Sequence, residues 1–154
     1  MKQTPLIAQH RAAGAKLVDF AGWEMPIQYS GVLDEYHTVR SKAGLFDVSH
    51  MGRLMVSGAG ALAFLQSVTT NDVAKLVVGQ AHYSMVCNDE GGIKDDIFVY
   101  RLKQTDYLLC VNASNREKVL TWLQAHPRDA NVVLEDHSDQ MAQIALQGPI
   151  SKDI

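Results

Sequence analysis

Hydrophobic and polar positions between residues 53 and 136 follow strand and helix periods in a regular order. Alternating apolar runs predict strands over residues 53–57, 81–87, 93–102, 107–111 and 131–134. Apolar positions at helical spacing predict a helix over 58–68 and a second one that begins at a capping box, Ser114 to Glu117. The order β-α-β-β-β-α-β predicts an α+β layer with its helices on one sheet face, related to the ferredoxin-like arrangement.

The segments on either side of this unit have weaker patterns. A helix is predicted from Pro5 to a stop at Gly14, followed by a strand over residues 15–20. A second helix over 32–43 carries its acids at the start, its bases at the end and Gly44 as the residue after its C-terminus. Its apolar stripe consists of Val32, Tyr36, Val39 and Ala43.

A further strand is predicted over residues 140–146, close to the end of the chain. Residues 1–50 have no evident partners elsewhere in the sequence. We therefore expect a discontinuous domain made of residues 1–52 and 137–154, with residues 53–136 inserted in it. We expect this domain to be truncated, with its remainder beyond residue 154, so that the chain is a fragment.

Composition and charge exclude several classes of protein. Of the 154 residues, 47% are hydrophobic and 20% are charged, as in ordinary globular domains. The formal net charge of -3 and the absence of a Lys/Arg cluster argue against a nucleic-acid partner. No apolar run approaches the roughly 18 residues that span a membrane, and no targeting segment is visible, so a cytoplasmic location is expected.

The cysteines and histidines predict no metal site and no disulfide framework. Cys87 and Cys110 lie in apolar strand-like runs, where a free cysteine usually behaves as a small buried hydrophobic residue. The histidines have no ligand-like spacing. Adjacent Ser49 and His50 do not make a catalytic pair, because a nucleophile and its base are neighbours in space and need a third orienting group.

Residues 91–100, Gly-Gly-Ile-Lys-Asp-Asp-Ile-Phe-Val-Tyr, carry the strongest chemical signal. Strand side chains alternate between faces, so Asp95 and Asp96 point to opposite sides of the sheet. Asp96 shares its face with Phe98 and Tyr100, an arrangement that suits a flat, nitrogen-bearing ligand. The alternative is that both acids simply begin a hairpin strand near its solvated turn. The residues expected on the Asp95 face are Ile93, Ile97 and Val99.

Two more residues are open to two interpretations. Asn112, between a strand and the second helix of the unit, either caps that helix or presents its amide to a heterocycle across the sheet end. Tyr83, on the strand paired with 93–102, is either a core residue with a satisfied hydroxyl or a ligand contact. The glycines of residues 57–61 lack the spacing of a dinucleotide-binding loop.

Several ordered blocks together make the chain resemble a known family. They are Thr4-Pro5-Leu6, Val18 to Pro26 (VDFAGWEMP), Gly44 to Gly52 (GLFDVSHMG), Thr70-Asn71-Asp72, Gly91 to Asp96 (GGIKDD) and Gln147-Gly148-Pro149. Over essentially its whole length the chain resembles the N-terminal part of the aminomethyltransferase family, the T protein of the glycine cleavage system.

This resemblance implies an activity and a set of site residues. Family members transfer the one-carbon unit of an aminomethyl group, carried on the lipoyl arm of the H protein, to tetrahydrofolate, with release of ammonia. The resemblance implies that Asp96 is the catalytic residue, at the reactive folate nitrogens. It also implies folate contacts from Met51, Tyr83 and Asn112, with Tyr100 as a weaker addition on the Asp96 face.

The chemistry is consistent with a carboxylate at this position. Cleavage of a carbon–sulfur bond next to nitrogen develops positive charge, which a preorganised carboxylate stabilises, and the same group can orient or deprotonate a folate nitrogen. Because family members are much longer, we expect the isolated chain to have little or no transferase activity.

Three other interpretations remain open. One is a folate-binding accessory protein of the iron–sulfur or tRNA-modification type, although the paired acids argue against it. The second is the folate domain of a related demethylase or of a sarcosine or dimethylglycine dehydrogenase. The third is a structural or interaction domain.

Overall fold

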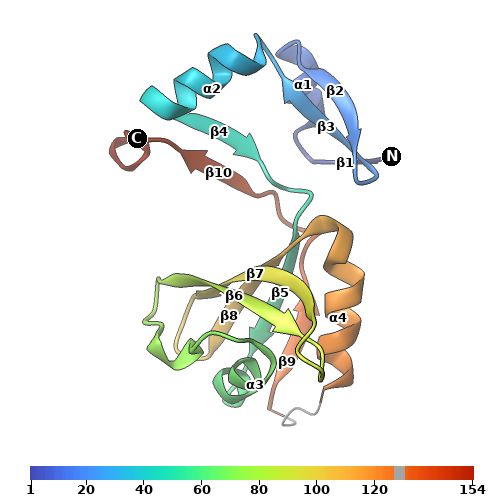
Figure 1. Cartoon of the computed structure of the whole chain (residues 1–154), viewed down its shortest axis with the longest axis vertical. Helices are drawn as coiled ribbons and strands as arrows, with labels where there is room; N and C mark the ends of the chain where they lie inside the picture. The colour runs from blue at the N-terminus through green and yellow to red at the C-terminus, as the bar shows by residue number, and fades with distance from the viewer. Residues whose placement is uncertain (127–130) are drawn as a thin grey trace. The chain divides into compact units, whose positions relative to one another are not determined.

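The computed structural model describes residues 1–126 and 131–154, which form two compact units. The first unit consists of Met1–His50 and Met141–Ile154, and the second unit of Met51–Gln140 (Figure 1). From the sequence we had predicted that the chain passes from one domain to the other between residues 52 and 53 and back between residues 136 and 137. Both units mix helices and strands, so the predicted α+β class is confirmed.

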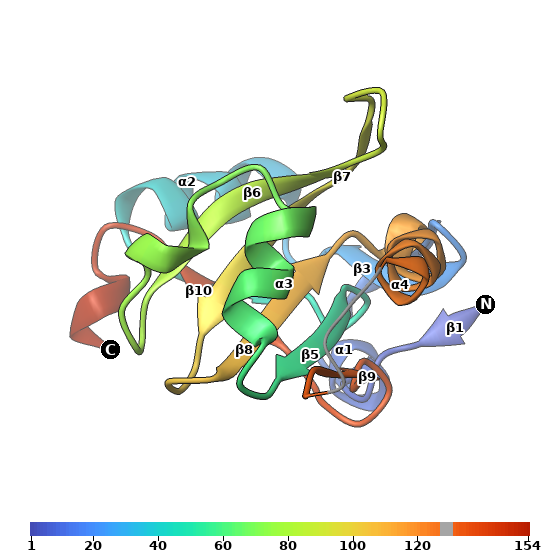
Figure 2. The same cartoon turned by 90° about the horizontal axis from the view of Figure 1, so that it is seen from below.

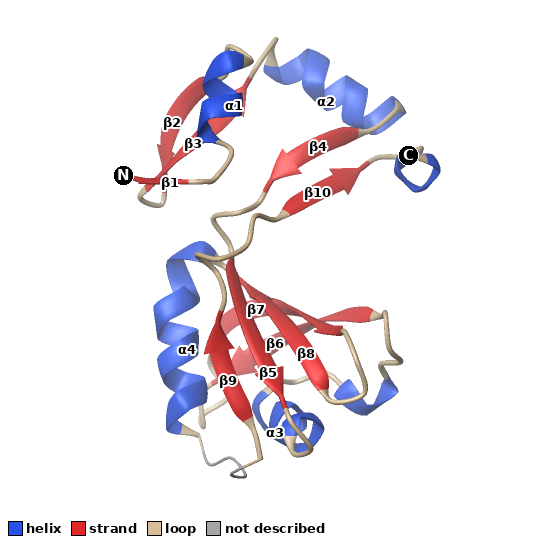
Figure 3. Cartoon of the chain, turned by 180° about the vertical axis from the view of Figure 1, so that it is seen from behind, coloured by secondary structure: helices blue, strands red, loops and turns tan. Residues whose placement is uncertain are grey.

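The second unit is built on one large sheet. Its strands are β5 (Gly52–Ser57), β6 (Ala81–Cys87), β7 (Ile93–Arg101), β8 (Asp106–Val111) and β9 (Val133–Asp136). Its helices are α3 (Ala61–Val68) and α4 (Arg116–Ala125), with short 3-10 turns η1 (Val73–Lys75) and η2 (Ala113–Asn115). The strands lie in the order β6-β7-β8-β5-β9, and all neighbours are antiparallel (Figure 3).

Both helices share a core with one face of this sheet, which we call the core face. Figure 2 shows α3 over the strands, and its apolar stripe is buried there. The strands contribute the residues at every second position, as the pleat requires. The buried strand and helix residues are Leu54, Val56, Val86, Ile97, Val99, Tyr107, Leu109, Val111, Ala61, Phe64, Leu65, Val68, Val119 and Leu123. The opposite side of the sheet is called the open face.

Strand β7 separates the two acids as its alternation predicted. Asp95 is 3% exposed and lies on the core face with Ile97, whereas Asp96 and Phe98 are exposed on the open face. The prediction that Ile93 shares the Asp95 face is wrong, since Ile93 is 65% exposed. The β6–β7 register shifts between Val86 and Cys87, and such a bulge re-aims the residues before it.

The ferredoxin-like description stays a prediction. Strands β8 and β9 are both antiparallel to β5 between them, so α4 connects parallel strands as a split β-α-β unit does. Strands β5 and β6, which flank α3 in sequence, run in opposite directions because two strands lie between them. Helix α3 therefore does not connect two parallel strands, whereas both helices of the ferredoxin-like arrangement do.

The first unit contains two smaller sheets. Its strands are β1 (Lys2–Gln3), β2 (Lys16–Phe20), β3 (Trp23–Gln28), β4 (Gly44–Asp47) and β10 (Ile144–Gln147). They pair as β1-β3-β2 and β4-β10. Its helices are α1 (Ile7–Ala12) and α2 (Val32–Ser41), with a 3-10 turn η3 (Ser151–Asp153). Strand β3 was not predicted, and Pro26 lies within it.

Helix α2 departs from its prediction in two ways. It ends at Ser41, and Gly44 opens strand β4 instead of following the helix C-terminus. No residue of α2, all of which the structure describes, is buried, and Val32 and Tyr36 are 57% and 56% exposed. Of the predicted stripe, Val32 and Tyr36 are thus exposed, whereas Val39 and Ala43 are half-buried. Among the described helices, none has the length and apolar composition of a membrane span.

Candidate functional site

The predicted site residues lie in neighbouring rows across the open face of the large sheet. Phe98 pairs with Cys110 on β8 and with Tyr83 on β6, and Cys110 pairs with Arg53 on β5. This middle row is followed, two residues further on, by the row of Met55, Leu108, Tyr100 and Ala81.

The third row lies at the end of the sheet where β5 begins. Asp96 pairs with Met85, and continuation of the β7–β8 register places Asn112 opposite Asp96. Gly52 pairs with Val111, so Met51 and Asn112 are the next residues beyond that pair on neighbouring strands. The fold thus aligns Met51, Asn112 and Asp96 along one end of the sheet.

The Asp96 carboxylate is held by the Asn112 amide and interacts with the Tyr83 hydroxyl. The Asn112 amide donates from Nδ2 to Asp96 Oδ1 at 3.0 Å and also lies 3.1 Å from the Asp96 carbonyl oxygen. A hydrogen bond with Asp96 is the main cause that raises the pKa of Tyr83, because the carboxylate opposes formation of the phenolate. The raised pKa keeps Tyr83 a neutral phenol, and the Asn112 amide orients the Asp96 carboxylate on an exposed surface.

Asp95 anchors the same region from the core face. Its Oδ2 accepts from the Asn112 backbone N–H at 2.9 Å, and its Oδ1 accepts from Asn112 Nδ2 at 2.9 Å and from Asn115 Nδ2 at 2.6 Å. The Asn112 amide thus bridges both acids. Asn112 Nδ2 has two N–H groups but lies within hydrogen-bond distance of three acceptor oxygens, so at least one N–H is shared between acceptors.

One prediction about the start of α4 is wrong, and one of the two interpretations of Asn112 is excluded. Helix α4 begins at Arg116, and no side chain in the described chain caps it, so Ser114 and Glu117 do not form a capping box. Asn112 is not a cap either, because its amide crosses to the two acids. A buried carboxylate is a stronger acceptor than the local alternatives, and it takes up both asparagines.

An aromatic row lies beside Asp96. The rings of Tyr83 and Phe98 meet edge to face with centroids 5.6 Å apart, and Phe98 and Tyr100 lie 6.1 Å apart. Tyr83 and Phe98 are 49% and 45% exposed, so much of this aromatic surface faces outward. Burial, and after it the nearby Cys110, raises the pKa of Tyr100. Phe98 joins the two predicted tyrosines and was not itself predicted as a site residue.

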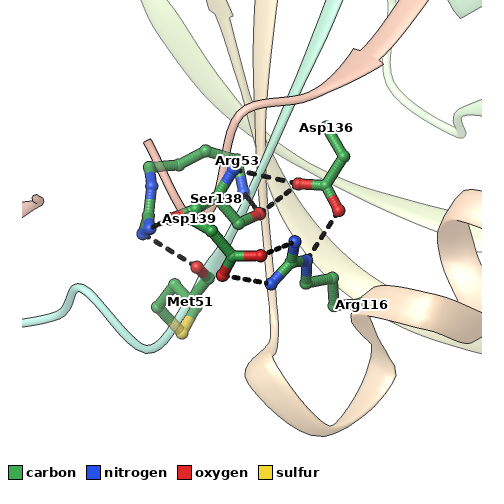
Figure 4. Close-up of polar contacts among 6 residues, drawn as sticks. All are labelled: Met51, Arg53, Arg116, Asp136, Ser138 and Asp139. Carbon is green, nitrogen blue, oxygen red and sulfur yellow. Dashed lines mark hydrogen bonds and ion pairs between the residues drawn. The ribbon is translucent and has the colours of Figure 1, made fainter. Parts of the chain in front are cut away.

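Met51 is held through its main chain by Arg53. Arg53 Nη1 donates to the Met51 carbonyl oxygen at 2.8 Å, and Nη2 donates to the Ser138 carbonyl (Figure 4). Gly52 between them has close neighbours, since a Cβ there would lie 2.4 Å from Val111 Cγ2. The order Met-Gly-Arg therefore lets the chain enter the sheet tightly against β8.

The first unit has a separate polar cluster. His10 is buried, and its Nε2 lies 2.8 Å from Asp47 Oδ2 while its Nδ1 lies 2.8 Å from the Tyr29 hydroxyl. Burial raises the pKa of Asp47, but hydrogen bonds from Ser49, Thr4 and His10 outweigh burial and lower it. Tyr29 and Asp47 also line a cleft of about 640 Å³ formed by β3, α2 and β4. The first unit thus carries a cleft without any of the predicted site residues.

The histidines and acids do not gather into a metal-binding group. Within residues 1–126 and 131–154 no three or more His, Cys, Asp or Glu side chains could together hold a metal ion. What the open face offers is a fixed carboxylate, a neutral phenol, an amide and an aromatic surface. Such a combination can orient a flat heterocycle and stabilise positive charge beside it.

Comparisons with known proteins place this arrangement in a family. The family model described as the GCVT N-terminal domain matches residues 6–154. The chain is 53% identical over 154 residues to the aminomethyltransferase of Desulfitobacterium hafniense (strain DSM 10664 / DCB-2), covering 100% of this chain and 42% of that protein. It is 55% identical over 149 residues to the aminomethyltransferase of Chloroherpeton thalassium (strain ATCC 35110 / GB-78), covering 97% and 41%.

A solved structure gives the same answer. The chain resembles the crystal structure of glycine cleavage system aminomethyltransferase T from Bartonella henselae with a TM-score of 0.91 and 37% sequence identity. That match covers 99% of this chain and 42% of the other. The chain therefore spans about two fifths of the length of the relatives it matches. The resemblance seen in the sequence blocks is confirmed, and the chain belongs to the GCVT N-terminal domain family.

Proposed function

We propose that this chain is the N-terminal part of a tetrahydrofolate-dependent aminomethyltransferase of the glycine cleavage system. The complete protein takes the one-carbon unit from the aminomethyl-lipoyl group of the H protein and passes it to tetrahydrofolate, with release of ammonia. The observation that carries the proposal is the exposed Asp96 carboxylate, oriented by Asn112 and Tyr83 beside an aromatic surface. The chain's relatives supply the reaction class.

Asp96 is the catalytic residue of this proposal. When the carbon–sulfur bond breaks, the carbon next to nitrogen gains positive charge, and a carboxylate already held in place stabilises that charge without reorganising. The same carboxylate can accept a proton from a folate nitrogen within hydrogen-bond reach. The Asn112 amide holds Asp96 Oδ1 and the Tyr83 phenol interacts with the same carboxylate, so the group meets a ligand in a restricted orientation.

The remaining contacts bind the folate. Tyr83 and Tyr100 offer rings to the flat pterin, and Phe98 between them continues that surface. Asn112 lies at the sheet end. Its side-chain oxygen Oδ1 can accept a hydrogen bond from a heterocycle N–H while its Nδ2 donates to the two acids. Met51, at the same end, supplies an apolar side chain of adaptable shape.

The isolated chain is proposed to be inactive as a transferase. It spans about two fifths of its relatives, and contacts to the rest of the folate and to the H protein are expected from the part of those proteins that it does not match. A cytoplasmic location also remains a proposal.

Binding of tetrahydrofolate to the purified chain tests the site. By titration calorimetry under anaerobic conditions we expect saturable binding, and a loss of about ten- to a hundredfold in affinity in Asp96→Asn, since a charge-assisted contact contributes about 1.5–3 kcal/mol. Asp89→Asn is the matched control, because Asp89 is exposed in the turn before the same strand. Its affinity should equal that of the wild type.

Other outcomes decide between the alternatives. Binding that Asp96→Asn leaves unchanged would contradict the role of the carboxylate and favour a folate-binding accessory protein. No binding by a chain that is shown to be folded would favour a structural or interaction domain.

A further inference from the structure

A buried arginine connects both ends of the second unit. Arg53 on β5 is 1% exposed, and its backbone N–H donates to Ser138 Oγ at 2.8 Å. Its guanidinium spans two carbonyl oxygens, those of Met51 and Ser138 (Figure 4). The segment after β9 is thereby held against the residue that precedes β5.

The partner segment is itself anchored to α4. Asp136 accepts from the backbone N–H of Ser138 at 2.9 Å and from its hydroxyl. Arg116, the first residue of α4, donates from Nε to Asp136 Oδ2 at 2.7 Å and from both Nη atoms to Asp139 at 3.0 and 2.9 Å. The segment whose Ser138 carbonyl bonds Arg53 is therefore anchored to α4 by Arg116, which pairs with Asp136 and binds Asp139 through two parallel hydrogen bonds.

Met51 depends on this brace because of its place in the sheet. It precedes Gly52, whose pairing with Val111 is the last one between β5 and β8 at that end. The Met51 carbonyl lies beyond this last ladder pair, where the Arg53 guanidinium donates to it at 2.8 Å. The contact sets the direction in which the chain leaves the sheet, next to Asn112 and Asp96.

We infer that Arg53 is a positioning residue for the proposed folate surface: it fixes the Met51 main chain at the sheet end so that the Met51 side chain continues the row of Asn112 and Asp96. This inference rests on the proposed function for its ligand, although the geometry of the brace does not. Burial of a guanidinium is costly unless its N–H groups are bonded, and here the bonds go to the two segments that must meet. A charge placed there for solubility would instead face water.

Arg53→Met is the decisive variant, because methionine keeps an unbranched apolar stem and removes every donor. Arg101→Met is its matched control. Arg101 is a partly buried arginine of the same unit that donates to the carbonyls of Leu76 at 2.6 Å and Gln104 at 3.0 Å, in the turns beside β6 and β8. Each variant removes hydrogen bonds to two carbonyl groups, but only Arg53→Met removes one at Met51.

Two readouts separate this inference from the proposed function. The first is the methyl resonance of Met51 in protein labelled with 13C-methyl methionine. The natural chain has six methionines and each Arg→Met variant has seven, so the Met51 signal is assigned with Met51→Leu in every background. The second is affinity for tetrahydrofolate, compared with the midpoint of thermal unfolding.

In Arg53→Met we expect the Met51 resonance to shift and broaden, and folate affinity to fall about tenfold. In Arg101→Met the Met51 resonance and the affinity should stay as in the wild type, even where the unfolding midpoint falls equally. Arg53→Lys, which keeps one donor group, should restore part of both signals and covers the case in which Arg53→Met does not fold.

An unchanged Met51 resonance in a folded Arg53 variant would overturn the inference. Equal loss of affinity in the Arg53 and Arg101 variants would overturn it as well, because it would reduce Arg53 to a stabilising residue. If the wild-type chain binds no folate, the proposed function fails, and the resonance comparison alone decides whether Arg53 positions Met51.

Discussion

Replacing Asp95 by asparagine is expected to destabilise the second unit strongly while changing the shape of one residue very little. Asp95 is 3% exposed and accepts hydrogen bonds from the Asn112 backbone, the Asn112 amide and the Asn115 amide. An asparagine keeps one acceptor oxygen, but its amide NH2 group replaces the second oxygen and points toward these donors. Buried donors then face a donor, which costs more than the loss of the bonds themselves.

The size of the effect follows from the hydrogen bonds that the substitution removes. Hydrogen bonds to a charged group contribute about 1.5–3 kcal/mol each, and the asparagine can retain at most part of them. Because such contributions are not additive, a loss of about 3 kcal/mol in the free energy of unfolding is a reasonable expectation. For a domain of roughly 60–100 residues this lowers the unfolding midpoint by about 12 to 24 °C.

Fluorescence in urea and heat can follow this unit by itself. The chain has two tryptophans, and in a Trp23→Phe background Trp122, which packs against the core of the second unit, reports alone. Asp96→Asn is the matched control on the next residue of β7, where the exposed side chain should change stability by about 0.5 kcal/mol or less. A loss of similar size in the two variants would refute the reasoning, because it would mean that burial and bonding of Asp95 do not distinguish it from its neighbour.

Two pH-dependent effects should accompany these changes. Since Asp96 raises the pKa of Tyr83, that pKa should fall toward its ordinary value of 10.0 in Asp96→Asn. Ultraviolet titration against Tyr83→Phe measures this shift, and an unchanged curve would show that the hydrogen bond does not form in solution. The pKa of Asp47 is lowered in the folded chain, so its contribution to stability is present above its unfolded value of about 3.9 and is lost as pH falls through the folded one. The difference in unfolding free energy between the wild type and Asp47→Asn should therefore be larger at pH 7 than below about pH 4. Trp23 fluorescence in a Trp122→Phe background measures this difference. A difference that does not change with pH would contradict the expectation.

What the sequence predicted well depends on short-range geometry. Strand alternation alone put Asp95 and Asp96 on opposite faces, because successive side chains of a strand cannot share one. The strands and helices of the second unit were likewise found from their periods. The bulge that moves Ile93 into solvent escaped prediction, since a register shift depends on the partner strand and leaves little trace in the local pattern.

What it missed depends on partners distant in sequence. The capping box at Ser114 is a sound local rule, but Asp95 lies 20 residues before Asn115 and takes its amide. For the same reason the two interpretations of Asn112 could not be separated until β7 and β8 were paired. Arg53 would pass for a solvated strand residue, because its partner Ser138 lies 85 residues away.

The meeting of Arg53 with Ser138 also bears on how the first unit can form. Strand β4 must find β10 across 97 residues, as in the pairing of Asp47 with Ile144. Closing a flexible loop of that length costs about 4 kcal/mol in chain entropy. The second unit, once folded, already holds its own first and last segments together, so the strands that leave it start close to each other. Folding of residues 51–140 thus converts a long-range search into a local one, and a lesion in the Arg53 brace should delay assembly of the first unit although it lies in the second.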